Sequence, residues 1–386
     1  MRTLLHVVLR ELYRISSKRE YWFSMLVAPL VCVFFFTSIM DEGLPHDMPI
    51  GIVDQDCTPT SRNLVRNLNS FEHIKIAEAY PNVTEARKAT QRGDIYGFYF
   101  IPKGTTKKAN RQESPVVSFY TNYTFIVAGS LLYKDMRTMS ELASGAAGRK
   151  VLYARGASEK GALGFLQPIV IDSHAIGNPT LNYSIYLSNT LIPGVLMLFI
   201  FMVTVYSMGA EIKESTGEAL LRAAGDNPLR ALYGKLIAHA LIWIGIGAIY
   251  VFYLYGVLLY PCYCGIPTML GVMALGVFAA QGMGTLMICA LPSPRLGLSF
   301  ASLWGVISFS ISGMSFPVMA MHPILQSLAW LFPLRHYFLL YVNCALDGFP
   351  IINAWPYVIA LLAFALLPAL LPTRFRNIMT KIAYKQ

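Results

Sequence analysis

No aspartate, glutamate, lysine or arginine occurs between Lys235 and Arg295, and this uncharged stretch constrains the fold more than any other feature. A helix needs about 20 mostly apolar residues to cross a bilayer, so two crossings must fit here. Residues 260–267, with Pro261 and Pro267, form a turn that separates them. Only 13% of the 386 residues are charged, against roughly a quarter in a soluble domain. We therefore expect an α-helical polytopic membrane protein.

Four further apolar stretches raise the expected number of transmembrane helices to six. The predicted spans cover residues 21–40, 187–208, 236–260, 268–291, 296–321 and 351–371. The first span is longer than the apolar region of a signal peptide, which favours an uncleaved anchor. Residues 41–186 separate it from the other five and form a predicted inserted domain.

The distribution of lysine and arginine predicts the orientation of these spans. Basic residues precede the first span and follow the second, fourth and sixth, whereas residues 261–267 have none and residues 322–350 have only Arg335. Because short cytoplasmic loops are enriched in basic residues, both termini, the loop 209–235 and the tail 372–386 are expected in the cytoplasm. Residues 41–186 then lie outside. These flanks explain the net charge of +10 better than binding to nucleic acid does.

The segment 41–186 is predicted to be an extracytoplasmic α/β domain. Strands are expected at residues 49–54, 74–79, 95–101, 116–120 and 168–171, and helices at residues 83–92, from 125 to about 155, and after Pro59 with Thr58 as a possible cap. Strands that alternate with helices are typical of a small α/β fold.

The titratable residues of this domain do not form a recognisable catalytic group. Asp54 and Asp56 suggest a metal or phosphoryl site, but no partner cluster accompanies them, and a turn role for Asp56 at the start of the next helix is favoured. We expect His46, His73 and His174 at the surface. The sequence therefore predicts no enzyme, metal site or cofactor here.

Residues 1–20 are predicted to form an amphipathic helix on the cytoplasmic membrane surface. One face carries Leu4, Val8, Leu12 and Ile15. The charged residues lie elsewhere on the helix, namely Arg10, Glu11, Arg14 and Lys18. A basic amphipathic helix suits the lipid interface, although the same residues also serve as a positive flank that orients the first span.

The loop 209–235 is predicted to be a structured connector. Ser215 or Thr216 is expected to cap a short helix that stops at Gly225, and a second helix is expected to begin near Pro228. A charged helix between two spans suits contact with a cytoplasmic partner. From these residues alone, a plain connector is an equal alternative.

At this loop the chain resembles the ABC-2 family of ABC exporter permeases. The residues that match the acidic, glycine-containing coupling segment of the family are Glu211, Glu214, Gly217, Leu221, Pro228, Gly234 and Lys235. Glu218 stands where many members have threonine. A second resemblance, to half-helices that dip into the outer leaflet, rests on Gly313, Phe316, Pro317, Pro323, Pro333 and Arg335, with His322 as an insertion. Residues 51–56, with Ser61 and Arg62, are similar to the large extracytoplasmic-loop subfamily of bacterial exporters.

The resemblance implies the permease subunit of an ATP-driven exporter in the bacterial cytoplasmic (inner) membrane. The chain has no G-x-x-x-x-G-K-[ST] motif, so ATP is expected on a separate ABC ATPase subunit, which Glu211, Glu214 and Glu218 would contact. It further implies pairing with a second copy or a sister permease, a possible periplasmic adaptor, and an amphipathic, drug-like or lipid-like substrate.

Two other functions stay open from the sequence: an ion-coupled secondary transporter, or a membrane-anchored extracytoplasmic binding or adaptor protein. Coupling ions usually need charged residues within the membrane, and the predicted spans hold only His239, which we expect at the cytoplasmic interface. Polar residues in the spans fit either a lipid-like cargo or ordinary helix packing, which is favoured: Gln281, Ser308, Ser310 and Ser312.

Overall fold

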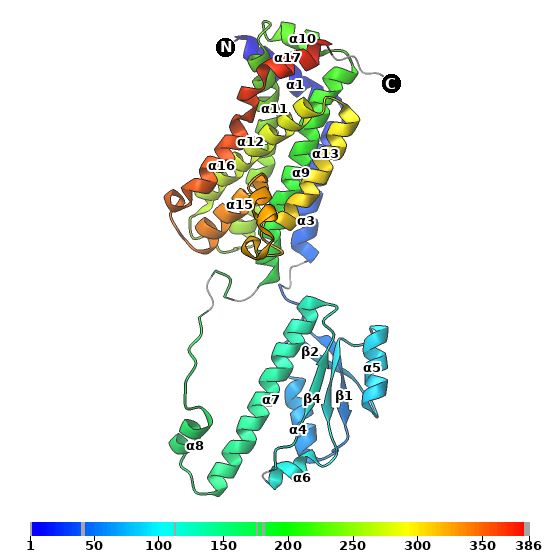
Figure 1. The fold of residues 1–386 in the computed structure, drawn as a ribbon, viewed down its shortest axis with the longest axis vertical. Coiled ribbons are helices and arrows are strands. Elements are labelled where there is room, and N and C mark those ends of the chain that lie inside the picture. Colours follow the sequence, from blue (N-terminus) through cyan, green and yellow to red (C-terminus); the bar gives the residue numbers. More distant parts are fainter. Residues whose placement is uncertain (1, 40–42, 112, 175–176, 180–181, 382–386) are drawn as a thin grey trace. The chain divides into compact units, whose positions relative to one another are not determined.

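The computed structural model describes residues 2–39, 43–111, 113–174, 177–179 and 182–381, and it divides into two compact units (Figure 1). The first unit combines Met1–Gly43 with Ala175–Gln386, and the second is Leu44–His174. The predicted junction at residues 40–41 and the end of the tail, 382–386, lie outside the described residues.

Within the described residues, five helical segments of the first unit are long and apolar enough to cross a membrane. They are Arg19–Ile39 (α2, Arg19–Tyr21; η1, Trp22–Val27; α3, Ala28–Ile39), α9 (Tyr183–Lys213), Pro228–Val257 (α11, Pro228–Phe252; η2, Tyr253–Val257), α12 (Ile266–Ala290) and Ile351–Leu370 (η5, Ile351–Ala354; α16, Trp355–Leu366; η6, Leu367–Leu370). The chain is a mostly helical, multi-pass membrane protein.

The fifth predicted span, 296–321, is wrong at its C-terminal end. The helix found there, α13, covers Pro294–Ile311, whose 18 residues extend about 27 Å. It cannot continue because Gly313 has a φ of +97°, and because Pro317 disfavours the helical conformation at the residue before it. Four short helices follow: η3 (Val318–Ala320), α14 (Pro323–Ala329), α15 (Pro333–Tyr341) and η4 (Val342–Leu346).

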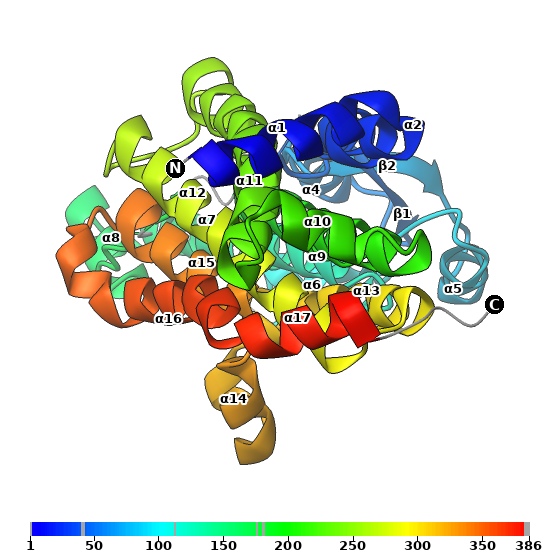
Figure 2. The same ribbon diagram turned by 90° about the horizontal axis from the view of Figure 1, so that it is seen from above.

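Helix α12 lies among the other long helices of this unit (Figure 2). Its Gly282 lies against α16, where a Cβ atom would overlap the carbonyl oxygen of Phe364. The buried Gln281 donates a hydrogen bond from Nε2 to the carbonyl oxygen of Leu236 in α11, at 3.0 Å. Gln281 therefore joins two helices, which supports the packing interpretation.

The second unit is a four-stranded sheet covered by helices on both faces (Figure 1). The strands lie in the order β2 (Ile74–Ala79), β1 (Met48–Asp54), β3 (Gly97–Ile101) and β4 (Ser118–Thr121). β1 is parallel to β2 and β3, whereas β4 is antiparallel to β3. Helix α5 (Val83–Arg92) packs on one face, and α4 (Pro59–Leu68) and α7 (Ile126–Ala154) pack on the other.

The local structure of this unit confirms most of the sequence prediction. Thr58 caps α4 in a capping box with Ser61. Asp56 does not cap that helix; its carboxylate accepts hydrogen bonds from Gly104 N, Thr106 N, Thr106 Oγ1 and Thr58 Oγ1, and so anchors the start of α6 (Thr105–Asn110).

Among the described residues, no group of three or more His, Cys, Asp or Glu side chains could hold a metal ion.

Two further predictions for this unit are wrong. Residues 168–171 form no strand; they follow helix α8 (Glu159–Leu166) in an irregular segment whose apolar side chains are exposed. His73 is buried rather than exposed, because its Nδ1 lies 2.9 Å from Oδ2 of the buried Asp135 in α7. Periodicity alone does not reveal a polar pair whose members are 62 residues apart.

Candidate functional site

The N-terminal helix α1 (Arg2–Ser17) packs across α11, which is where the candidate site begins (Figure 2). Its close approach depends on Gly234 of α11, because a Cβ atom there would lie 2.7 Å from Cγ1 of Val7. The buried face of α1 holds Val7, Val8 and Ile15, as an amphipathic helix requires. It also holds Glu11, which the sequence analysis placed away from that face.

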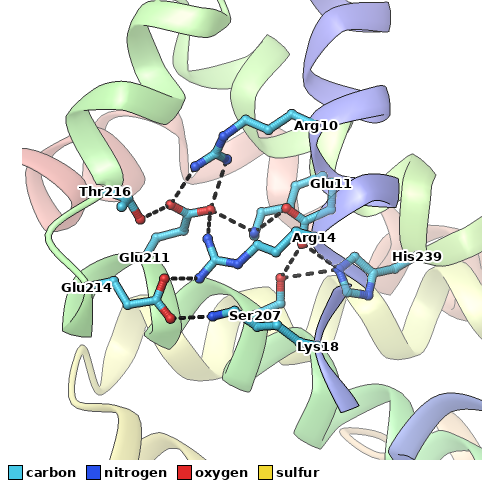
Figure 3. Close-up of polar contacts among 10 residues, drawn as sticks. Arg10, Glu11, Arg14, Lys18, Ser207, Glu211, Glu214, Thr216 and His239 are labelled. Atoms are coloured by element: carbon cyan, nitrogen blue, oxygen red, sulfur yellow. Dashed lines mark hydrogen bonds and ion pairs between the residues drawn. The ribbon is translucent and has the colours of Figure 1, made fainter. Parts of the chain in front are cut away.

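Glu11 is the centre of a fully buried polar group (Figure 3). Its carboxylate accepts hydrogen bonds from Lys235 Nζ at 2.6 Å, His239 Nε2 at 2.9 Å and Ser207 Oγ at 2.9 Å. These three residues come from α11 and α9. One carboxylate therefore joins three helices that are far apart in the sequence.

Glu211, near the end of α9, forms the second centre of the cluster. Arg10 binds both of its carboxylate oxygens, at 3.0 and 3.1 Å, and Arg14 Nη1 lies 2.5 Å from Oε1. Lys235 donates to the same oxygen at 3.1 Å, and the Thr216 hydroxyl donates to Oε2. Lys235 thus bridges Glu11 and Glu211, and its side chain is only 1% exposed.

The edge of the cluster reaches solvent at Glu214, whose side chain is 42% exposed. Arg14 Nη2 lies 2.8 Å from Glu214 Oε2, and Lys18 contacts the other oxygen. We call the whole set the charge cluster; its residues are Arg10, Glu11, Arg14, Lys18, Ser207, Glu211, Glu214, Thr216, Lys235 and His239.

The electrostatics of the cluster favour the charged forms of Glu11 and Arg14. Burial alone would raise the pKa of Glu11, but the Lys235 ammonium and the hydrogen bond from His239 hold that pKa well below its usual range. Burial opposes the charge on Arg14 as well, and the Glu211 carboxylate overcomes it, so the pKa of Arg14 is raised. Glu11 and Arg14 are therefore held as fixed charges within the cluster.

The structure changes the expected roles of the coupling-loop residues. Glu211 was expected to meet a partner, but its side chain is 0% exposed and its oxygens are bound within the chain. Thr216 precedes helix α10 (Gly217–Ala223) without capping it, because its hydroxyl donates to Glu211. Glu218 lies in α10, and of the three glutamates predicted to contact the ATPase it is the most exposed, with 65% of its side chain accessible to solvent.

The remaining residues of this loop are structural. Leu221 is buried, and Gly217 lies so close to α17 (Pro372–Lys381) that a Cβ atom would come within 2.5 Å of the Met379 carbonyl oxygen. Pro228 is the first residue of α11, a position that suits proline. Asn227 precedes it in an extended conformation and caps the helix. His239, expected at the cytoplasmic interface, is buried against Glu11.

The second predicted group does not join the charge cluster. Gly313, Phe316 and Pro317 follow α13, while the proline-initiated helices α14 and α15 begin at Pro323 and Pro333. This segment packs at the opposite end of α9, where the Tyr186 hydroxyl donates to the Met314 carbonyl oxygen. Helices α14 and α15 have seven and nine residues, too few to cross a bilayer.

Sequence reasoning named Lys235 as part of the coupling segment but did not pair it with Glu11, and it left Glu11, Ser207 and His239 out of the site. A signal was present, because Lys235 and His239 are four residues apart and so share a helix face. Glu11 supplies the complementary charge within the apolar face of α1.

Comparison with known proteins agrees with this architecture. No curated protein matches the sequence. The family model described as ABC-2 family transporter protein matches residues 19–373, which include all five candidate spans. In general terms, this family implies a permease with an ABC ATPase partner and a dimeric arrangement. The chain belongs to the ABC-2 family of transporter proteins.

Proposed function

We propose that this chain is the permease subunit of an ATP-driven exporter in which the charge cluster transmits the movement of a separate ATPase to the spans. The observation that carries the proposal is the double ion pair of Lys235 with Glu11 and Glu211. It fastens α1, α9 and α11 to one another directly beside α10. ATP is bound by the partner subunit, and the cargo is an amphipathic, drug-like or lipid-like molecule.

The exposed part of α10 is the surface on which the ATPase would dock. Glu218 points to solvent, and Glu214 next to the helix is half-exposed. Behind them, Leu220 and Leu221 are buried and Gly217 lies against α17, so α10 is seated in the membrane unit. A push on a seated helix moves its neighbours as a rigid body.

The finer topology belongs to this proposal. Six spans, with α13 as the fifth, place both termini and the charge cluster in the cytoplasm. The α/β unit and the α14–α15 segment then lie outside, where the short helices form a re-entrant element and the α/β unit meets a periplasmic adaptor. Support comes from the basic residues beside the cytoplasmic ends of the spans.

The buried carboxylate of Glu11 also bears on the alternative of a proton-coupled transporter. A proton carrier needs a carboxylate that gains and loses its proton near neutral pH. Lys235 and His239 hold the pKa of Glu11 far below that range. Glu11 is therefore a fixed charge, which favours the ATP-driven exporter.

The test measures whether the ATPase docks on α10. The chain is co-expressed with a candidate ABC ATPase subunit from the same organism, and the complex is purified through a tag on the chain. Glu218→Lys should reduce the ATPase recovered, because it reverses an exposed charge without disturbing the fold. Glu141→Lys is the matched control, since Glu141 is 64% exposed in α7 of the other unit. Unchanged recovery with Glu218→Lys would show that α10 is not the docking surface.

A further inference from the structure

An open apolar groove lies where α13 ends and the chain turns into η3 and α14. Its volume is about 610 Å³, within the roughly 300–1,000 Å³ of sites that bind small molecules. Apolar side chains from both segments line it: Val306, Ile307, Ile311, Phe316, Met321 and Leu325. Phe316 is half-exposed and Met319 in η3 is almost fully exposed, so the groove opens outward.

A guanidinium lies against the turn at the end of this groove. Nη1 of Arg335 donates to the carbonyl oxygen of Ser312 at 3.3 Å, and a Cβ atom on Gly313 would lie 3.0 Å from the same nitrogen. Ser312 directly follows Ile311, which lines the groove. The cation is thus held by the backbone that shapes the groove.

Arg335 has no carboxylate partner in the part of the chain that the structure describes. Carboxylates are rare in this half of the chain, because Asp347 is the only acidic residue from Pro228 to the C-terminus. The Nε atom of Arg335 is buried without a hydrogen-bond partner among the described residues. A partly buried cation next to an apolar groove favours a ligand that is both anionic and apolar.

We propose that the groove holds one acyl chain of an anionic phospholipid, whose phosphate pairs with Arg335. A zwitterionic lipid fills the groove equally well but brings its own cation to the guanidinium. Free phosphate pairs with the guanidinium but leaves the apolar side chains uncovered. A lipid with a net negative headgroup meets both requirements.

The experiment uses the full chain in nanodiscs that contain a trace of photoactivatable phosphatidylglycerol with a diazirine in one acyl chain. Crosslinked peptides are mapped by mass spectrometry, and a parallel sample carries phosphatidylcholine with the same acyl chains. The phosphatidylglycerol probe should label residues 306–325 about fivefold more than the phosphatidylcholine probe, the ratio expected for one cation beside a lipid surface. This comparison needs no variant. Equal labelling by the two probes would overturn the role of charge.

Variants test each half of the site. Arg335→Gln should remove the preference for phosphatidylglycerol, and Arg335→Lys should retain part of it. Ser310→Trp should reduce labelling by both probes, because Ser310 lines the groove. Arg295→Gln, at the other end of α13, is the matched control and should change nothing at residues 306–325. The proposal is wrong if Arg335→Gln keeps the preference, or if Ser310→Trp leaves the labelling intact.

Discussion

Nζ of Lys235 lies 2.6 Å from Oε2 of Glu11, and both side chains are buried although they are 224 residues apart in the sequence. This ion pair fixes where the N-terminal helix sits on α11. Buried ion pairs contribute little net stability compared with apolar side chains, but a buried charge left alone is costly. The ion pair therefore determines where α1 packs on α11 but adds little to the net stability of the protein.

Removing one member of this pair should be worse than removing both. Lys235→Met leaves two buried carboxylates without their shared cation and is expected to destabilise the protein by about 3–5 kcal/mol. Adding Glu11→Gln should recover a large part of that loss. Thermal unfolding of the four purified proteins forms the double-mutant cycle, and strictly additive effects would show that the pair is not coupled.

The stability of the protein should fall in acid in a way that depends on Glu11. Its pKa is depressed in the folded state, so the unfolded chain binds more protons and stability decreases as the pH falls below the unfolded value of 4.5. Above that value the stabilisation is fully present. Unfolding temperatures measured from pH 7 to pH 3 should show a shallower decline for Glu11→Gln than for the unmodified chain. Parallel curves would contradict the assignment.

Gly217 should tolerate no side chain, because α10 approaches the backbone of α17 there. Gly217→Ala places a Cβ atom 2.5 Å from the Met379 carbonyl oxygen and is expected to cost about 1–3 kcal/mol of stability. Gly245→Ala is the control, since its Cβ atom would meet nothing within 4 Å. Thermal unfolding should separate the two variants, and an equal unfolding temperature would show that the contact relaxes freely.

In the α/β unit, Asp56 should hold the start of α6 in place. Asp56→Ala removes the acceptor for two backbone N–H groups, those of Gly104 and Thr106. Each lost bond is worth about 1 kcal/mol, so these two amides should exchange their hydrogens roughly five times faster. Hydrogen exchange resolved to single residues checks this, with the Glu85 amide in α5 as an internal reference. If the Gly104 and Thr106 amides exchange at the same rate in Asp56→Ala as in the unmodified chain, Asp56 has no local role.

The sequence predicted what depends on local patterns. Apolar length located the five helical segments that are long enough to cross a membrane, and Pro228 marked the start of α11. Alternation and turn residues located β1 to β4. The end of α13 was misplaced because hydropathy continues through Ile311 into Phe316, whereas the backbone breaks at Gly313.

The charge cluster could be predicted only in part, because its contacts are non-local. Glu211 and Glu214 were singled out, but the guanidinium groups that bind them lie about 200 residues away in α1. A hydropathy pattern treats Glu11 and Lys235 as charges that belong in water. Only the packing of α1 on α11 at Gly234 shows that they neutralise each other.

The central claim is that the charge cluster transmits movement from the ATPase to the spans. With the exposed native Cys57 replaced by serine, spin labels at Leu259→Cys and Met319→Cys, both exposed, report the distance between the segment after η2 and helix η3 in the complex with the ATPase. Pulsed electron resonance should show a distance change on addition of ATP. In the Glu11→Gln/Lys235→Met background, we predict that the ATPase stays bound and hydrolyses ATP while this change is lost. The same ATP-dependent change in both backgrounds would contradict the account.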